Sequence, residues 1–140
     1  MNILLAVDGS DTSDRAARYV VQLAKQLAEP PTLTLVNVCA PLLPAAARKL
    51  GRKATGEYYA SGTEYATRKA RRILERAGLA FEQASPVGDA AEEITRLADR
   101  HDAGQIVMGS RGQTALKSLL LGSVASRVLA MSKVPVTVVR

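Results

Sequence analysis

Short apolar runs that alternate with amphipathic stretches are the feature that most constrains the fold of this chain. Residues Asn2–Val7 form a nearly continuous apolar run that stops at Asp8-Gly9-Ser10, as expected for a strand buried on both faces. Apolar residues then recur at helical spacing until Pro30-Pro31, and the branched run Thr32–Val38 indicates a second strand. Because strands that alternate with helices are joined by right-handed crossovers, the pattern predicts an α/β fold with a parallel sheet.

The rest of the chain continues this alternation after one irregular segment. Residues Ala40–Gly62 contain two prolines and three glycines, and we interpret them as a long loop with one helical turn at Ala45–Leu50. A helix is predicted from a capping box at Ser61 to Gly78. The remaining predicted elements are strands at Leu79–Val87, Gln105–Met108 and Pro135–Val139, and helices after Asp89, over Ala115–Leu121 and from Val124 to Met131. A chain of 140 residues with this pattern predicts one domain, residues 1–140.

The net charge of +6 comes from one segment of the chain. Between Arg48 and Arg76 there are nine basic and three acidic residues, and the rest of the chain is balanced. Spacing of Glu64 with Arg68, and of Arg71 with Glu75, favours a solvated helix face over a nucleic-acid interface. Tyr58 and Tyr59 precede this face, but without a recognised nucleic-acid motif they support base stacking only weakly. The basic segment is therefore predicted to be at most a docking surface for an unknown protein partner.

Several classes of protein are disfavoured by what the sequence lacks. No apolar stretch approaches the roughly 20 residues that span a bilayer, and Asp8 interrupts the first apolar run too early for a secretory signal. A single cysteine, Cys39, predicts a cytoplasmic protein without an intrachain disulfide. The only histidine, His101, is predicted to end a different helix, so Cys39 is interpreted as a small buried hydrophobe and not a nucleophile. No cluster of histidine, cysteine and carboxylate side chains predicts a metal site held by the protein alone.

Glycines follow the fourth predicted strand at a spacing suited to an anion. In open parallel sheets, ligands bind at the carboxyl ends of the strands where the strand order reverses. Gly109, Gly112 and Gly122-Ser123 fall in or after the fourth of these ends, where backbone amides at a helix start can hold phosphates. The same glycines would also suit a tight turn and a break between two helices. The sequence contains neither a P-loop nor the glycine pattern of dinucleotide-binding loops.

Three segments of the chain are typical of one known family. They are ILLAVDGS at the start, GDAAEEI at Gly88–Ile94, and VMGSRGQTALKSLLLGSVASRVLAMSKVPVTVVR at Val107–Arg140. With these segments the chain resembles the universal stress protein family. The last of these contains the spacing of the ATP-binding branch: Gly, two residues, Gly, nine residues, then Gly-Ser. The resemblance implies a single-domain Rossmann-like fold, of the adenine nucleotide alpha hydrolase-like type. Its five-stranded parallel sheet would have the order 3-2-1-4-5, with helices on both faces.

The resemblance also implies a set of site residues. Adenine and ribose would contact the ends of the first two strands, at Ala6, Asp8 and Val38. Many relatives have proline where this chain has Ala6, which matters little if the contact is to backbone. Asp8 would also lie near a divalent ion such as Mg²⁺ held by the phosphates, although an aspartate after a strand commonly caps its own turn. The ribose and phosphates would be surrounded by Met108, Gly109, Arg111, Gly112, Gly122, Ser123 and Val124.

The preferred hypothesis is a cytoplasmic module that binds ATP, ADP or AMP and hydrolyses little or none of it. Hydrolysis needs a positioned base or water-orienting group, and only Arg111, Lys117 and Asp8 are near the glycines. The alternatives are a slow ATPase or an adenylyl- or phosphoanhydride-cleaving enzyme on the same fold, and a partner-binding protein with a structural nucleotide. The resemblance further implies a homodimer through the last strand, Val134–Val139. The segment Leu42–Ser61 is predicted to lie over the nucleotide as a lid.

Overall fold

The protein is a single five-stranded parallel sheet covered by helices on both faces. The computed structural model describes residues 1–113 and 120–140. The strands lie in the order β3-β2-β1-β4-β5, and every neighbouring pair is parallel, which confirms the predicted order. Their bounds are Asn2–Ala6 for β1, Thr32–Val36 for β2, Glu82–Ala84 for β3, Gln105–Gly109 for β4 and Val136–Val139 for β5.

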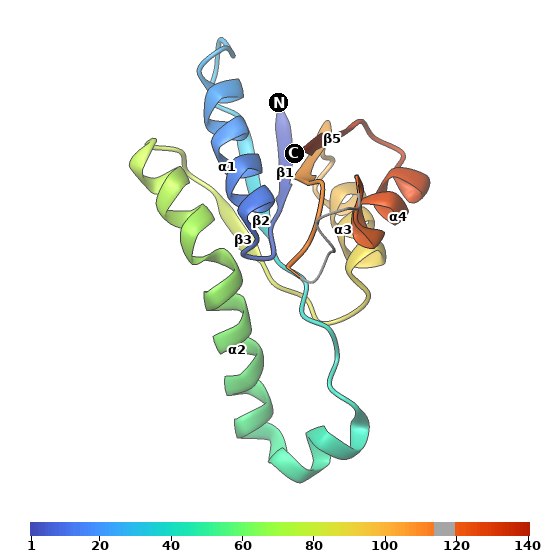
Figure 1. The fold of residues 1–140 in the computed structure, drawn as a ribbon. Coiled ribbons are helices and arrows are strands. Elements are labelled where there is room, and N and C mark those ends of the chain that lie inside the picture. The colour runs from blue at the N-terminus through green and yellow to red at the C-terminus, as the bar shows by residue number, and fades with distance from the viewer. Residues whose placement is uncertain (114–119) are drawn as a thin grey trace.

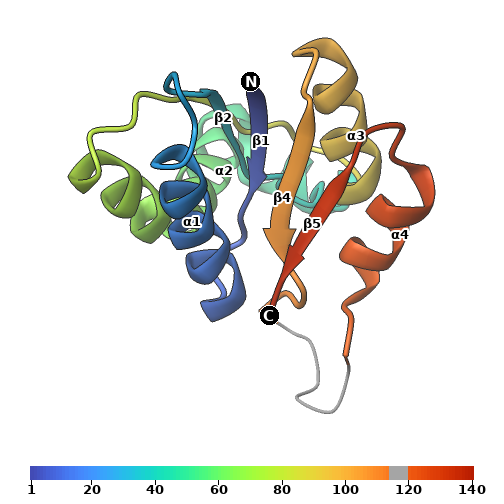
Figure 2. The ribbon, with the colours of Figure 1, turned by 90° about the horizontal axis from the view of Figure 1, so that it is seen from above.

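Alternate residues of the central strands build two separate cores. Ile3 and Leu5 of β1 pack in a cluster with α1 (Asp11–Ala24) and α2 (Pro44–Arg76), whereas Leu4 and Ala6 pack with α3 (Ala90–Arg100) and α4 (Ser123–Met131). Figure 2 shows the two helix pairs on opposite sides of the sheet. A strand that is buried on both faces has no polar alternation, which explains the continuous apolar run at the start of the chain.

Most element boundaries agree with the sequence to within two residues, but the end of α1 and one strand do not. Helix α1 ends at Ala24, although the predicted helical spacing continues to Pro30-Pro31. The predicted strand Leu79–Val87 is wrong at both ends, because β3 covers only Glu82–Ala84. Leu79 and Phe81 instead pack against the α1–α2 core, and Val87 makes an isolated bridge with Cys39. Most of the predicted helix Ala115–Leu121, including Lys117, lies outside the described residues.

The prediction of a long loop at Ala40–Gly62 is wrong. Helix α2 runs from Pro44 to Arg76, and Ser61 lies inside it instead of capping it. Gly51, with φ 79° and ψ 170°, kinks the helix after its first turns, so the predicted helical turn is the first part of α2. Arginine, lysine, glutamate and alanine dominate the segment after the kink, and their helix propensity outweighs the glycines, each of which costs about 1 kcal/mol.

Helix α2 extends well past the carboxyl edge of the sheet (Figure 1). Its carboxyl half is anchored on the core through Ala66, Thr67, Ala70 and Leu74, which are buried. No helix in residues 1–113 and 120–140 has the length and apolar character that crossing a membrane requires. The amino half of α2 lies below the sheet edge, beside the ends of the strands.

The basic face of α2 is partly neutralised by ion pairs. Arg71 lies 2.8 Å from the Glu64 carboxylate and 3.9 Å from that of Glu75, so the second predicted pair is confirmed, while Glu64 contacts Arg71 in place of Arg68. Lys69 lies 3.3 Å from Asp14, whose side chain is only 8% exposed, and this pair joins α2 to α1. These contacts give part of the basic segment a structural role.

Candidate functional site

A cavity of about 860 Å³ lies at the carboxyl ends of β1, β2 and β4. The strand order reverses between β1 and β4, which is where ligands bind in open parallel sheets. The volume is within the range of about 300 to 1,000 Å³ typical of small-molecule sites. The structure brings every predicted site residue to this cavity: Ala6, Asp8, Val38, Met108, Gly109, Arg111, Gly112, Gly122, Ser123 and Val124.

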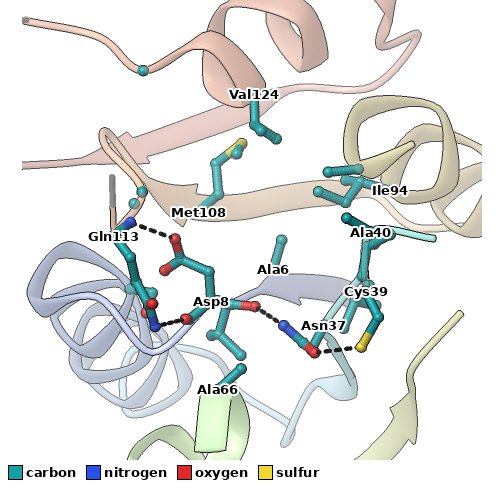
Figure 3. Close-up of a pocket in the computed structure, with 18 of the residues that line it drawn as sticks. Ala6, Asp8, Asn37, Cys39, Ala40, Ala66, Ile94, Met108, Gln113 and Val124 are labelled. Carbon is teal, nitrogen blue, oxygen red and sulfur yellow. Dashed lines mark hydrogen bonds between the residues drawn. The ribbon is translucent and has the colours of Figure 1, made fainter. Parts of the chain in front are cut away.

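Asp8 holds two loops together at the centre of the site. One carboxylate oxygen accepts the Ser10 N–H at 3.0 Å, which confirms the turn-capping interpretation. The other accepts the Gln113 N–H at 3.1 Å, and the Gln113 side-chain amide donates to the Asp8 carbonyl (Figure 3). Gln113 is a site residue that the sequence reasoning missed, because its partner lies 105 positions away.

The loop after β4 is also fixed from the side of α1. The hydroxyl of Thr12 donates to the Arg111 carbonyl at 2.6 Å, and that of Ser10 donates to the same carbonyl at 3.2 Å. Ser10 is at the same time the N-cap of α1, since its side-chain oxygen accepts the Ser13 N–H. The start of α1 therefore positions the backbone of the glycine-bearing loop.

Helix α4 begins at the cavity without a side-chain cap. Its N-cap is Gly122, with no capping hydrogen bond and no acidic residue in the first turn, whereas Ser10 caps α1 and Asp89 caps α3. The Gly122 N–H donates to the Ser110 carbonyl at 2.7 Å, which places the start of α4 against the loop after β4. The uncapped first N–H groups of α4 thus adjoin the cavity and can hold an anion.

The three glycines of the motif differ in what surrounds them. A Cβ on Gly109 would lie 2.5 Å from the Thr12 hydroxyl and 2.8 Å from the Ser13 nitrogen, so this glycine lets β4 pack against α1. A Cβ on Gly112 would lie 2.9 Å from the Asp8 carboxylate. A Cβ on Gly122 would lie 3.3 Å from the Arg111 Cα. Close backbone packing is thus one reason for the glycines, in addition to any contact with a ligand.

The side chain of Ser110 is buried, and its hydroxyl has no hydrogen-bond partner in the part of the chain that the structure describes. It is 1% exposed and lines the cavity, and its hydroxyl is the buried side-chain oxygen that lacks a hydrogen bond among the residues described. An unmade buried hydrogen bond costs about 1 to 3 kcal/mol. The Ser110 hydroxyl is closed to solvent.

The other end of the cavity is apolar and is built on the end of β2. Asn37 donates its backbone N–H to Ala84 and Cys39 donates its own to Pro86, both on the β3 side. Backbone groups alternate in direction along an extended chain, so the N–H and C=O groups of Val38 point to the other side, toward β1. Strand β1 has already ended at this level. Figure 3 shows Ala6, Met108, Ile94 and Ala40 around the space beside them.

Asn37 and Cys39 are polar neighbours of this apolar end. The Asn37 side chain is buried and donates to the Val7 carbonyl at 2.9 Å, which ties the ends of β1 and β2 together. The Cys39 sulfur lies 3.4 Å from the Thr63 hydroxyl and 3.7 Å from the Asn37 amide oxygen. Cys39 is half-buried with polar contacts, so the interpretation of it as a buried hydrophobe is corrected.

Helix α2 supplies the remaining wall of the cavity. The predicted lid segment does reach the site, but as helix, and the lining extends beyond it to Ala66. Ala66 lies against Gly9, where a Cβ would come within 3.2 Å of the Ala66 Cα. The Tyr59 hydroxyl accepts the Leu42 N–H at 2.9 Å and so attaches the connection from β2 to the helix. The aromatic residues of this segment are spaced as on one side of a helix, and this spacing was the sequence signal for the wall. The prediction of a loop excluded that interpretation.

Titratable side chains are few at this edge of the sheet. Among residues 1–113 and 120–140, no three histidine, cysteine or carboxylate side chains gather as a metal site. His101 is the C-cap residue of α3, and its carbonyl accepts the Asn2 side-chain amide at 3.2 Å, as its predicted place at a helix end implies. Among the described residues that line the cavity, Asp8 is the one with a carboxylate.

Asp89 braces the two helices on one side of the cavity. Its carboxylate caps α3 by accepting the Glu92 N–H at 3.1 Å and accepts a hydrogen bond from Arg127 of α4 at 2.6 Å. The hydrogen bond from Arg127, followed by that from the Glu92 backbone, holds the pKa of Asp89 below its ordinary value. The pair joins α3 to α4 just outside the pocket wall at Ala90.

We expect Asp89→Asn to make stability less dependent on acid pH. Asparagine keeps the cap but loses the charge. Because the folded-state pKa of Asp89 is lowered, its stabilisation is present above the unfolded-state pKa of about 3.9 and is lost as the pH falls through the folded-state pKa. Urea unfolding should find the variant less stable than the unmodified chain at pH 7, with a difference that shrinks below about pH 4. A difference that does not change with pH would contradict this assignment.

Comparison with known proteins places the chain in one family. The model of the universal stress protein family matches residues 1–140. Universal stress protein MJ0531 of Methanocaldococcus jannaschii is 34% identical, with 99% of this chain and 81% of the relative covered. A universal stress protein of Thermus aquaticus is 35% identical, with 99% of this chain and 97% of the relative covered.

Solved structures agree with this result. The structure of MJ0577 from the same archaeon is 31% identical with a TM-score of 0.78, covering 99% of this chain and 94% of the other. A universal stress protein in complex with cAMP is 26% identical with a TM-score of 0.72, covering 100% and 97%. The chain belongs to the universal stress protein family.

Proposed function

We propose that this chain is a universal stress protein that binds an adenine nucleotide, ATP, ADP or AMP, in the cavity at the carboxyl ends of β1, β2 and β4. The observation that carries the proposal is the uncapped start of α4 at Gly122-Ser123, held against the loop Gly109–Gly112 at the mouth of an apolar pocket. A relative of the same family is described as a complex with cAMP, which supports an adenine nucleotide as the ligand.

The polar and apolar ends of the cavity suit different parts of the nucleotide. The phosphates would lie at the start of α4 and the loop after β4, contacting Gly112, Gly122, Ser123 and Arg111, where backbone N–H groups and the helix dipole favour anions. The ribose would lie near Asp8, Gly109 and Met108.

The adenine would occupy the apolar end, where flat aromatic ligands gain from burial. It would lie beside Ala6, Val38 and Val124, and the backbone groups of Val38 would hydrogen-bond to its edge. Alanine at position 6 provides the same backbone as the proline of many relatives. Asp8 would be close to a Mg²⁺ ion carried by the phosphates, and this ion would arrive with the nucleotide because carboxylates that could hold it alone are not gathered here.

Binding with little or no hydrolysis is the activity that the site favours. The Asp8 carboxylate already accepts the backbone N–H groups of Ser10 and Gln113, one at each oxygen, so it is poorly placed to act as a base toward water. Nucleotide occupancy would then act as a signal in a cytoplasmic stress response, through α2 and its basic face or another surface that a partner protein reads.

The test is the fate of ATP on the purified protein. Mass spectrometry of ligand released from freshly prepared protein should detect ATP, ADP or AMP. Added ATP with Mg²⁺ should bind at a 1:1 ratio, raise the midpoint of thermal unfolding and remain intact over many minutes. Rapid stoichiometric conversion to ADP or AMP would instead favour the alternative, an ATPase or adenylyl-transferring enzyme on the same fold. Absence of binding to any of the three nucleotides would contradict the proposal.

We also propose a homodimer through the outer edge of β5. Strand β5 is at the edge of the sheet. The carbonyls of Pro135 and Val139 accept backbone hydrogen bonds from the side of β4. Because the direction of backbone groups alternates along a strand, the N–H and C=O groups of Val136 and Val138 point away from β4. A second copy of β5 would form hydrogen bonds with these groups.

Val138→Pro should abolish this dimer without disturbing β4. Proline removes an outward N–H group and is tolerated on an edge strand. Sedimentation velocity should detect a dimer of the unmodified chain and a folded monomer of the variant, with unchanged circular dichroism. An unmodified chain that is monomeric at high concentration, or a variant that still dimerises, would contradict pairing through β5.

A further inference from the structure

One face of α2 presents two tyrosines separated by a glycine to the cavity. Tyr58, Gly62 and Tyr65 all line it. At about 100° per residue they fall within about 60° of one another around the helix axis, so they form a single stripe. Tyr58 and Tyr65 are about 10 Å apart along that axis, with Gly62 between them.

Both aromatic side chains are unusually open to solvent for residues that adjoin a pocket. Tyr58 is 55% exposed and Tyr65 is 62% exposed, although tyrosine normally buries most of its ring. The Tyr58 ring is braced edge-on by Tyr59, with centroids 5.6 Å apart, and Tyr59 is itself held by its hydrogen bond to Leu42. The Tyr58 ring is therefore a supported aromatic surface, and residues 1–113 and 120–140 leave more than half of each of the two tyrosines exposed.

Gly62 leaves open space between the two rings. A Cβ built on it would meet no heavy atom within 4 Å, so neither packing nor backbone conformation requires a glycine in this helix. Alanine would favour the helix by about 1 kcal/mol, as judged by host peptides, so glycine here is costly to stability. A glycine that the fold does not need, on a wall of a ligand cavity, permits close approach of a ligand to the helix backbone.

The face of α2 next to the stripe contacts the segment that follows β2. The Cys39 sulfur lies 3.9 Å from the Tyr59 carbonyl and 3.4 Å from the Thr63 hydroxyl, so this part of α2 lies directly beside the residue that follows Val38. A planar group whose edge formed hydrogen bonds with the Val38 backbone would therefore have α2 on its other side.

We propose that Tyr58, Gly62 and Tyr65 form the nucleobase-contacting wall of the site, with the base lying over Gly62 and against the tyrosine rings. This inference rests on the proposed nucleotide-binding function and adds the residues of α2 that select a planar base. Stacking of one base on one aromatic ring changes affinity by about 5-fold to 150-fold in other proteins. The phosphates would remain at the start of α4.

Gly62→Ala and Gly56→Ala form a matched pair for the test. Gly56 is in the same helix and also has open space around its Cβ position, but it does not line the cavity. Each substitution should raise the thermal midpoint by roughly 3 °C. Only Gly62→Ala should weaken ATP binding, by about 10-fold or more as judged by calorimetry, because its methyl group occupies the space of the base. Equal affinities for the two variants would overturn the inference.

Tyrosine emission provides a second readout, because the chain has no tryptophan and four tyrosines. Stacked adenine should quench the emission on titration with ATP. Tyr65→Phe should keep the affinity within about 2-fold and lose part of the quenching, whereas Tyr65→Ala should weaken binding about 10-fold. Unaltered affinity and quenching in both variants would overturn the wall assignment while leaving the nucleotide proposal intact. Failure of the unmodified chain to bind ATP would reject the nucleotide proposal itself and this inference with it.

Discussion

Gly122→Val is expected to reduce the affinity for ATP by at least about 100-fold, which is what losing two phosphate hydrogen bonds of charged character would do. A Cβ at this position already lies 3.3 Å from the Arg111 Cα and 3.4 Å from the Ser110 carbonyl oxygen. The additional methyl groups of valine would push the loop after β4 away from the start of α4. The phosphates would then lose the two surfaces that are proposed to hold them together.

Isothermal calorimetry with ATP and Mg²⁺ measures this effect, and Gly122→Ala is the graded control. Alanine adds only the Cβ, so its loss of affinity should be smaller than that of valine. Urea unfolding should find the Gly122→Val variant folded, since the clash is confined to a loop that can shift. A folded Gly122→Val variant with the affinity of the unmodified chain would mean that the phosphates bind elsewhere.

The second large effect is expected on stability. Gly109→Ala should lower the free energy of unfolding by about 3 kcal/mol or more, at the upper end of the cost of overpacking. The added Cβ would lie 2.5 Å from the Thr12 hydroxyl and 2.8 Å from two backbone atoms of the first turn of α1. Because backbone atoms cannot move aside as a flexible side chain can, either β4 or α1 must shift.

Gly104→Ala is the matched control for this prediction. Gly104 directly precedes β4, and a Cβ there would lie 3.6 Å from the Asn2 carbonyl oxygen, an ordinary contact. The control should change the free energy of unfolding by about 0.5 kcal/mol or less, as surface substitutions usually do. Urea denaturation of the two variants separates the cases, and a Gly109→Ala variant as stable as the control would disprove the packing role.

Gly109 and Gly122 belong to one motif in the sequence, but different contacts constrain them in the structure. Gly109 is constrained by a helix that begins about 100 residues earlier in the chain, whereas Gly122 is constrained by the loop next to it. The spacing of the glycines indicated a phosphate site, and the same positions also satisfy close packing that exists only in the folded chain.

The fold was largely predictable because its elements are signalled locally. The apolar runs at Asn2–Val7 and Thr32–Val38 contain the central strands β1 and β2, and Ser10 and Asp89 cap α1 and α3 as their positions indicated. Parallel pairing follows from the alternation of strands and helices. The strand order itself came from the family resemblance, since periodicity alone does not choose between permutations of a parallel sheet.

The amino half of α2 was not predictable from the same signals. Its glycines and prolines are typical of a loop. The part of the helix before Ala66 has no stripe of buried apolar residues, so the sequence there lacks the apolar spacing that indicates a helix. A helix that projects beyond its sheet satisfies its backbone internally and depends on helix propensity along its length. The wall of tyrosines was missed for this reason: Tyr58 was considered only as a residue that could stack on nucleic-acid bases, and Tyr65 was not considered.

The sequence by itself determined the α/β class and most of the strands, because these depend on composition or spacing within a short window, and the resemblance to the family supplied the ten predicted residues that meet at the cavity. Only the tertiary structure decided how those residues are held. Asp8 is fixed by Gln113, the Arg111 carbonyl by Thr12, and the cavity is closed by α2. These contacts join residues that are distant in the chain and depend on atomic directions, which no local pattern of residue types specifies.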